Sequence, residues 1–318
     1  MIPVTWASYA QSHRHAECLA VCQMVMADLT VIRYQHINEF LKATETYLQQ
    51  HEIKNTFVLT TAHQIQKKEN VSYYCGAIWN EKHEMMFAIL AQENGYLYAS
   101  TLYDEARPEA IGLLTKDLLE TSLNVQGLHG YQPVLDALLN AIETQSAMTF
   151  VRKFATMSYK LRQVKWSSRS KEISAARSTS LRLASASDFD LLQKWTFGFI
   201  QDAFDDPKII NEPVASISRD MITSKQLYLL CIHGSPVSMA WKVRPLKYGT
   251  SLAYVYTPRE HRNKGYGAAC VAMTSEAILR DYSYITLFVD VERDPEDNLY
   301  TRVGYKYFGE AGRLERLI

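Results

Sequence analysis

The chain reads Leu252-Ala-Tyr-Val-Tyr-Thr-Pro-Arg-Glu-His-Arg-Asn-Lys-Gly-Tyr-Gly-Ala-Ala-Cys270 at the point that decides its fold. An apolar, aromatic run ends in the turn Arg262-x-x-Gly265-x-Gly267, and a helix is predicted directly behind the glycines. The first N–H groups of a helix lack partners within it and carry the positive end of its dipole, so this turn favours an anion. Because glycine has no Cβ, the backbone can approach a phosphate closely. The stretch therefore predicts a site for a ligand that carries a pyrophosphate.

Length and composition indicate a globular protein with about two domains. The chain has 318 residues, of which 47% are hydrophobic, enough for real cores. Its 34 basic and 34 acidic residues balance, which removes the global electrostatic argument for a nucleic acid or membrane partner. The N-terminus lacks a signal-peptide pattern and no run of 18 apolar residues occurs, so we expect a soluble, cytoplasmic protein.

The cysteines predict neither a metal site nor a disulfide framework. Five are scattered along the chain: Cys18, Cys22, Cys75, Cys231 and Cys270. Cys18 and Cys22 have the spacing of one helical turn, but no second Cys/His pair follows at zinc-finger distance. We expect reduced, buried thiols and no bound metal.

A serine-rich segment at residues 166–180 divides the chain. It holds several basic residues and few large apolar side chains, which is typical of a linker. The sequence therefore predicts one domain at residues 1–165 and a second at residues 181–318.

Both halves show an alternation of strands and helices. In the second half, strands are predicted at Leu181–Ala184, Gln226–His233, Val237–Val243, Thr250–Tyr256, Tyr284–Val289 and Tyr305–Phe308, and helices behind Asp188, at Val214–Ser224, behind the glycine turn and at Asn298–Val303. In the first half, helices are predicted at His15–Met26, Ile37–Gln50, Pro108–Leu119 and Gln132–Thr144, and strands at Phe57–Thr61, Ser72–Trp79, Met85–Leu90, Tyr96–Leu102 and Met157–Val164. The first half lacks the glycine turn, and its nearest equivalent, Gly127-Leu-His-Gly130, favours a loop.

A second motif, Tyr300-Thr-Arg-Val-Gly304-Tyr305, follows the glycine turn near the end of the chain. With both motifs, residues 181–318 resemble the GNAT superfamily of acyl-CoA-dependent N-acetyltransferases, whose hallmarks are Arg/Gln-x-x-Gly-x-Gly/Ala after a strand and then Tyr-x-x-x-Gly-Phe/Tyr. The whole chain resembles, more weakly, tandem GNAT proteins whose N-terminal copy has lost the turn. The resemblance implies two α/β (α+β) domains, each a mixed, mostly antiparallel twisted sheet flanked by helices, with splayed central strands in the C-terminal copy.

The resemblance also implies acetyl-CoA as co-substrate. Its pyrophosphate would lie on the turn amides, and its pantetheine arm would pair with the main chain of the preceding strand, where the amide of Val255 or a neighbour would bind the thioester carbonyl. The implied cofactor-binding residues are Val255, Tyr256, Thr257, Arg262, Asn263, Lys264, Gly265, Tyr266, Gly267, Ala268 and Asn298. For Asn298, capping of the short helix is the alternative, because it lies two residues before Tyr300 and the relatives place it three before.

Tyr300 matches the general acid of the family, and its alternative role is to pack against the cofactor. A phenol with a pKa near 10 suits protonation of a thiolate of similar basicity. The general base stays open among a water chain and several acidic or imidazole side chains: Asp202, Asp205, Asp206, Glu260, His261, Asp290 and Glu292.

Two functions remain open at this stage. One is direct transfer of an acetyl group to a primary amine of a small molecule or peptide, with no covalent enzyme intermediate, since only Cys270 lies near a motif and it falls inside a helix. The other is a non-catalytic, acyl-CoA-binding or regulatory module. Dinucleotide-binding and P-loop patterns are absent. The first half would build one wall of the acceptor pocket, and the oligomeric state stays open between monomer and homodimer.

Overall fold

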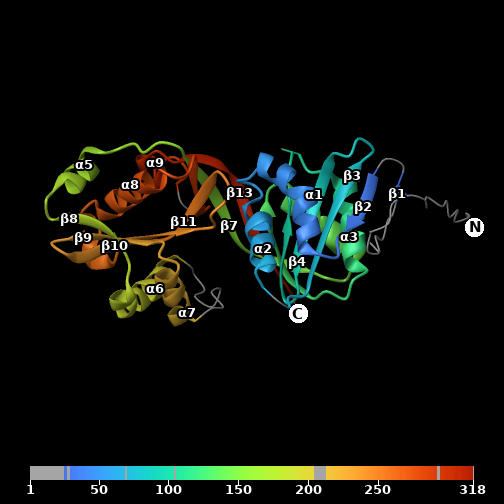
Figure 1. Cartoon of the computed structure of the whole chain (residues 1–318), viewed down its shortest axis with the longest axis horizontal. Helices are drawn as coiled ribbons and strands as arrows, with labels where there is room; N and C mark the ends of the chain where they lie inside the picture. The colour runs from blue at the N-terminus through green and yellow to red at the C-terminus, as the bar shows by residue number, and fades with distance from the viewer. Residues whose placement is uncertain are drawn as a thin grey trace, which may run out of the picture.

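The computed structural model describes residues 25–26, 29–68, 70–103, 105–203, 213–291 and 294–317. Two lobes lie end to end and meet through long strands at the middle of the molecule (Figure 1). The strands described form one continuous sheet in the order β1-β2-β3-β4-β5-β6-β13-β7-β12-β11-β10-β9-β8. The pairing is antiparallel except for β5 with β6 and β11 with β12. The mixed, mostly antiparallel sheet predicted for both halves is confirmed.

We call β1–β6 with α1–α4 the first lobe, and β8–β12 with α5–α9 the second lobe. The first lobe contains β1 (Val25–Met26), β2 (Leu29–Arg33), α1 (Ile37–Gln50), α2 (Thr56–Gln66), β3 (Tyr73–Asn80), β4 (Met85–Gln92), β5 (Gly95–Ala99), α3 (Pro108–Leu119), β6 (Val125–Tyr131) and α4 (Val134–Gln145). The second lobe contains α5 (Ser168–Ala175), β8 (Thr179–Leu183), α6 (Phe189–Ala203), α7 (Val214–Thr223), β9 (Leu227–Ile232), β10 (Ser235–Val243), β11 (Gly249–Tyr256), α8 (Tyr266–Ile278), β12 (Tyr284–Asp290) and α9 (Leu299–Val303). Between the lobes lie β7 (Phe150–Leu161) and β13 (Lys306–Arg316).

Each lobe has three layers, with helices on both faces of the sheet. In the first lobe, α3 and α4 pack on one face through Leu114 and Leu138, and α1 and α2 pack on the other through Phe40 and Leu59. In the second lobe, α5, α8 and α9 cover one face, and α6 and α7 cover the other (Figure 1). Burial of these apolar faces is the main force that holds each lobe together.

The central strands cross from one half of the sequence to the other. Strand β7 pairs with β12 on one side, from Leu161 opposite Ile285 to Thr156 opposite Asp290, and with β13 on its other side. Strand β13 in turn pairs with β6. Strand β7 of the first half therefore lies between two strands of the second half, and β13 of the second half lies between two strands of the first half. The lobes cannot separate without breaking these backbone ladders. The domain boundary at residue 165 stays a prediction.

The segment predicted as a linker is structured. Residues 168–175 form α5, and Ser167 caps its start by accepting a hydrogen bond from the Ser170 N–H at 3.1 Å. Ile173 is buried against the core of the second lobe. Serine is common both in flexible linkers and at the first position of helices. Burial of Ile173 stabilises the helix in this segment.

Two local predictions in the first half are wrong. Residues 57–61 were expected as a strand but lie in α2, where Val58, Leu59, Ala62 and Ile65 are buried at helical spacing. The predicted loop at Gly127–Gly130 lies in β6, because β13 pairs with it from a distant part of the chain. A Cβ at Gly127 would lie 2.3 Å from the Leu314 carbonyl oxygen, which explains that glycine as close strand packing.

Two further expectations concern the start of the chain and membranes. The helix predicted at residues 15–26 falls outside the described residues except for Val25–Met26, which belong to β1. Among the described helices, none has the length and the hydropathy that a bilayer crossing requires. The remaining predicted helices and strands of both halves are present, with ends shifted by a few residues and with β7 and β13 longer than expected.

Candidate functional site

A gap opens between β11 and β12 where their pairing stops. The two strands are paired only from Gly249 to Ser251 on β11 and from Tyr284 to Thr286 on β12. Farther along, Tyr254 has a left-handed φ of 49°, and the register of β10 against β11 shifts between Met239 and Trp241. Such a bulge bends a strand and increases its twist. The splayed central strands expected of the second half are therefore present.

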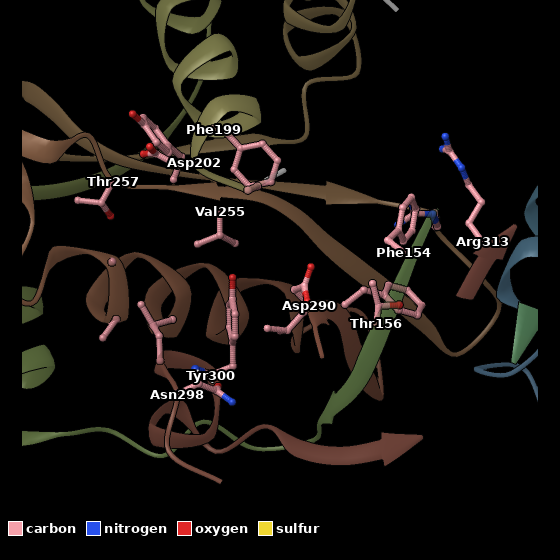
Figure 2. A pocket seen from close by; sticks show the side chains of 18 of the residues that line it. Phe154, Thr156, Phe199, Asp202, Val255, Thr257, Asp290, Asn298, Tyr300 and Arg313 are labelled. Carbon is pink, nitrogen blue, oxygen red and sulfur yellow. Dashed lines mark hydrogen bonds between the residues drawn. The ribbon is translucent and has the colours of Figure 1, made fainter. Parts of the chain in front are cut away.

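A pocket of about 1090 Å³ occupies this gap. Val255 lies on its β11 side, and Val289 and Asp290 on its β12 side. The N-terminus of α8 and the α9 residues Leu299 and Tyr300 complete this part of the lining (Figure 2). All cofactor-binding residues predicted from the sequence line the pocket except Lys264, whose ammonium donates a hydrogen bond to the Glu260 carbonyl oxygen at 2.9 Å.

The glycine turn has the backbone that its sequence predicts. Gly265 precedes α8 with a left-handed φ of 85°, and Asn263 has a φ of 61°. A Cβ on Gly265 would lie 2.8 Å from Cγ of Arg169 in α5, and one on Gly267 would lie 3.0 Å from Oγ1 of Thr257. An added Cβ would therefore be crowded at both positions, and at Gly265 the left-handed φ disfavours it as well. The first N–H groups of α8 lie at the pocket.

Arg262 fastens the turn to its surroundings. Its Nε donates to the Thr257 carbonyl oxygen at 2.9 Å, and its guanidinium pairs with Asp202 of α6, which also pairs with Arg259 at 2.8 Å. Hydrogen bonds from Arg259 and Arg262 lower the pKa of Asp202. Asp202 is thus held ionised by two arginines, which makes it a structural anion beside the turn and a poor general base.

Asn298 caps α9. Its Oδ1 accepts hydrogen bonds from the N–H groups of Tyr300 and Thr301, at 2.9 and 3.1 Å. Its Nδ2 donates to the Asp294 carbonyl oxygen at 2.9 Å and to the Tyr159 hydroxyl at 3.2 Å. The capping role that the sequence left open is therefore present, and a contact with a cofactor stays a prediction.

Tyr300 stands in the middle of the pocket. Its position is set by the Asn298 cap and by an edge-to-face contact with Tyr305, with ring centroids 6.1 Å apart. Figure 2 shows its hydroxyl directed across the pocket towards Val255. The first helical turn of α9 thus places a phenol opposite the open edge of β11.

The positions of the candidate general bases in the structure reduce their number. Asp290 lines the pocket between Tyr300 and Thr156 (Figure 2). His261 also lines it, whereas Glu260 is exposed outside the lining. Asp205, Asp206 and Glu292 lie outside the described residues. The described residues contain no group of three His, Cys, Asp or Glu side chains that could hold a metal ion.

The first lobe supplies one wall of the pocket, as the sequence hypothesis suggested, but through residues that no motif indicated. Helix α2 contributes Phe57 and Thr61, β5 contributes Tyr98, and β6 contributes His129. Phe57 packs on His129 and Phe288, at centroid distances of 3.9 and 5.4 Å. Phe57 and His129 fall in the two segments whose secondary structure was predicted wrongly, so the sequence carried no signal that they meet.

The imidazole of His129 is neutral in this setting. Burial lowers its pKa from the ordinary 6.5 to about 3, and the nearby charges of Arg244 and Arg313 act in the same direction. This end of the pocket therefore draws its positive charge from the two guanidinium groups.

Comparisons with known proteins agree with this architecture. Residues 231–314 match the family model described as FR47-like protein. Comparison with the curated proteins finds no match. Similar solved structures include a GNAT-family acetyltransferase from Colwellia psychrerythraea, with a TM-score of 0.54 and 9% identity over 91% of this chain and 99% of that chain. A GCN5-related N-acetyltransferase from Sphaerobacter thermophilus has a TM-score of 0.52 and 12% identity over 90% of this chain and 95% of that chain. A Drosophila protein has a TM-score of 0.55 and 12% identity over 89% and 95%.

These likenesses establish the fold. Because they span nine-tenths of this chain and almost all of the two bacterial proteins, they include both lobes. The chain has the fold of these GNAT-type acetyltransferases over both lobes, with the glycine turn in its second lobe.

Proposed function

We propose that this chain transfers an acetyl group from acetyl-CoA to a primary amine of a small molecule or peptide, by direct attack in a ternary complex. The supporting observation is that one pocket combines three elements: a glycine turn at the start of α8, an open edge of β11 and the hydroxyl of Tyr300. Each element matches one need of acyl transfer from a thioester, namely an anion site, a guide for an extended arm and a proton donor.

The pocket residues fit coenzyme A. The turn amides of residues 263–268 would hold the pyrophosphate, since glycine at 265 and 267 keeps side chains away from the backbone. The main chain of Val255, Tyr256 and Thr257 would pair with the pantetheine arm, because β11 has no partner from β12 in this stretch. When bound, acetyl-CoA supplies the acyl group activated as a thioester.

Two groups of this chain would then stabilise the transfer. An N–H at or next to Val255 would donate to the carbonyl oxygen on which negative charge develops. Tyr300 would give its phenolic proton to the departing thiolate, whose basicity is close to that of a phenol. The side chains of Val255 and Tyr300 lie on opposite sides of the gap (Figure 2), which supports a reacting carbon between β11 and the phenol.

The test is release of free CoA, followed with a thiol reagent, across a panel of primary amines. We expect Tyr300→Phe to lower turnover by about 10²–10⁴-fold while CoA affinity changes little, because a general acid contributes in this range. Tyr307→Phe is the matched control, since Tyr307 is exposed on β13 and outside the pocket lining.

Two results would contradict the proposal in different ways. CoA binding without release on any amine would favour a non-catalytic acyl-CoA-binding module. Unchanged turnover in Tyr300→Phe would remove Tyr300 from the acid role while leaving the transferase in place.

A further inference from the structure

The pocket has a second end, at the junction of the lobes, that the proposed chemistry does not use. We call it the arginine end, formed by Arg244, Arg313 and His129 with aromatic walls from Phe57 and Phe154. In Figure 2, Phe154 and Arg313 lie on the opposite side of the pocket from Thr257, with Tyr300 and Asp290 between them. The arginine end is therefore on the acceptor side, away from the glycine turn.

Arg244 carries a charge that the described protein does not neutralise. It directly follows β10 with a left-handed φ of 52°, and its guanidinium lies 5.3 Å from the ring centroid of Phe57. Within the part of the chain that the structure describes, no carboxylate forms an ion pair with it. Burial lowers its pKa, although an arginine stays protonated in proteins. Removing a cation from water without a counter-ion costs free energy, so an anion bound to Arg244 would be stabilised there.

Arg313 adds a second guanidinium from β13, the strand that pairs with β6. It pairs with Glu315 and lies 4.9 and 5.0 Å from the ring centroids of Tyr96 and Phe154. Arg313 lies opposite His129 in the pairing of β13 with β6, and the Phe57 ring that Arg244 contacts packs on His129. All four residues line the pocket. A neutral imidazole at this end of the pocket can form a hydrogen bond with a ligand without adding a charge.

We propose that the amine acceptor also carries an acidic group, a carboxylate or a phosphate, which binds at the arginine end while the amine lies beside Tyr300. This inference rests on the proposed function and names the substrate class of the same pocket. The planar fork of arginine binds both acid groups bidentately, and a desolvated setting strengthens such bonds. The middle of the pocket fits as well, because the Asp290 carboxylate lies where a cationic amine would pass.

The experiment compares matched pairs of amines that differ only in the acid group. Phenylalanine is paired with phenethylamine, and O-phosphoethanolamine with ethanolamine, each with saturating acetyl-CoA and CoA release as the readout. We expect the acidic member of at least one pair to have a kcat/KM higher by about 10–100-fold, the range of a charge-assisted hydrogen bond. The pair that shows the preference identifies the acid as carboxylate or phosphate.

Variants locate the preference in the structure. Arg244→Gln should reduce the preference to about one, mainly through the KM of the acidic amine, because the charge of this half-buried guanidinium is lost. Arg244→Lys, which keeps a charge without the fork, should retain part of it and also covers the case that the glutamine variant does not fold. Arg219→Gln is the control, since Arg219 lies 5.7 Å over the Phe189 ring but outside the pocket lining.

The outcomes separate this inference from the proposed function. Equal or faster acetylation of the neutral-tailed amines by the wild-type protein, or a preference that persists in Arg244→Gln, overturns the acidic acceptor and leaves the transferase standing. Absence of CoA release from all four amines and from the wider panel contradicts the proposed function, and the acidic acceptor falls with it.

Discussion

Gly265→Ala tests the glycine turn through both stability and binding. Gly265 has a φ of 85°, and a left-handed backbone costs a residue with a Cβ about 1–2 kcal/mol. The lower entropy of the unfolded alanine chain offsets about 0.4–1 kcal/mol of this cost. The new Cβ would also lie 2.8 Å from Arg169 Cγ and 3.2 Å from Ile173 Cδ1, so α5 must shift. We expect a net loss of about 1–3 kcal/mol of unfolding free energy.

Gly234→Ala separates the backbone cost from the contact with α5. Gly234 lies between β9 and β10 with a φ of 78°, and nothing lies within 4 Å of its added Cβ. Its alanine variant should lose only the backbone part, about 1 kcal/mol or less. The difference between the two variants therefore measures the contact of the turn with Arg169 and Ile173.

Urea denaturation gives the two stability losses, and calorimetry gives the affinity for CoA. We expect Gly265→Ala to weaken CoA binding by about tenfold or more, because a shifted turn loses at least one charge-assisted hydrogen bond from its amides. Gly234→Ala should bind CoA like the wild-type protein. If both variants lose the same stability and both bind CoA normally, the turn is not the phosphate site and the reasoning is refuted.

Two further predictions concern the junction of the lobes. Buried Glu52 accepts hydrogen bonds from the Lys247 N–H at 2.8 Å and from the Tyr284 hydroxyl. We expect Glu52→Ala to lower the unfolding free energy in urea denaturation by about 2–4 kcal/mol, and a loss below about 0.5 kcal/mol would show that these bonds do not stabilise the junction. Burial lowers the pKa of His129 to about 3, so its imidazole stays neutral in the folded protein. The unfolded chain takes up a proton there below about pH 6.5. The unfolding free energy should therefore fall as the pH is lowered from about 6.5 to 3, by up to about 1.4 kcal/mol per pH unit. His129→Gln should lose this part of the slope, and an identical slope in the variant would show that His129 titrates normally.

Much of the second half was predictable because its signals are local. The apolar run that ends at Tyr256, the glycines at 265 and 267, and the Tyr300 motif each determine backbone or helix start within a few residues. Glycine at a left-handed φ and an asparagine at a helix start are short-range requirements that a sequence displays directly.

The errors arose where distant strands or helices decide the local structure. Residues 127–130 contain two glycines, a composition typical of turns. They nevertheless form a strand, because β13 from the far end of the chain pairs with them. Residues 57–61 have an apolar run that suits a strand or a helix equally, and packing on β4 and β5 selects the helix. In both cases the burial of backbone and side chains against a remote segment outweighs the local preference.

The sequence alone determined the GNAT resemblance, the glycine turn and the tyrosine of the second motif, since each depends on residues adjacent in the chain. Only the tertiary structure decided that β7 and β13 cross between the halves, that α5 covers the turn, and that Arg244 meets Phe57 and His129. The physical reason is that these contacts join segments more than ninety residues apart. Their proximity depends on the packing of the whole sheet and leaves no mark in local periodicity.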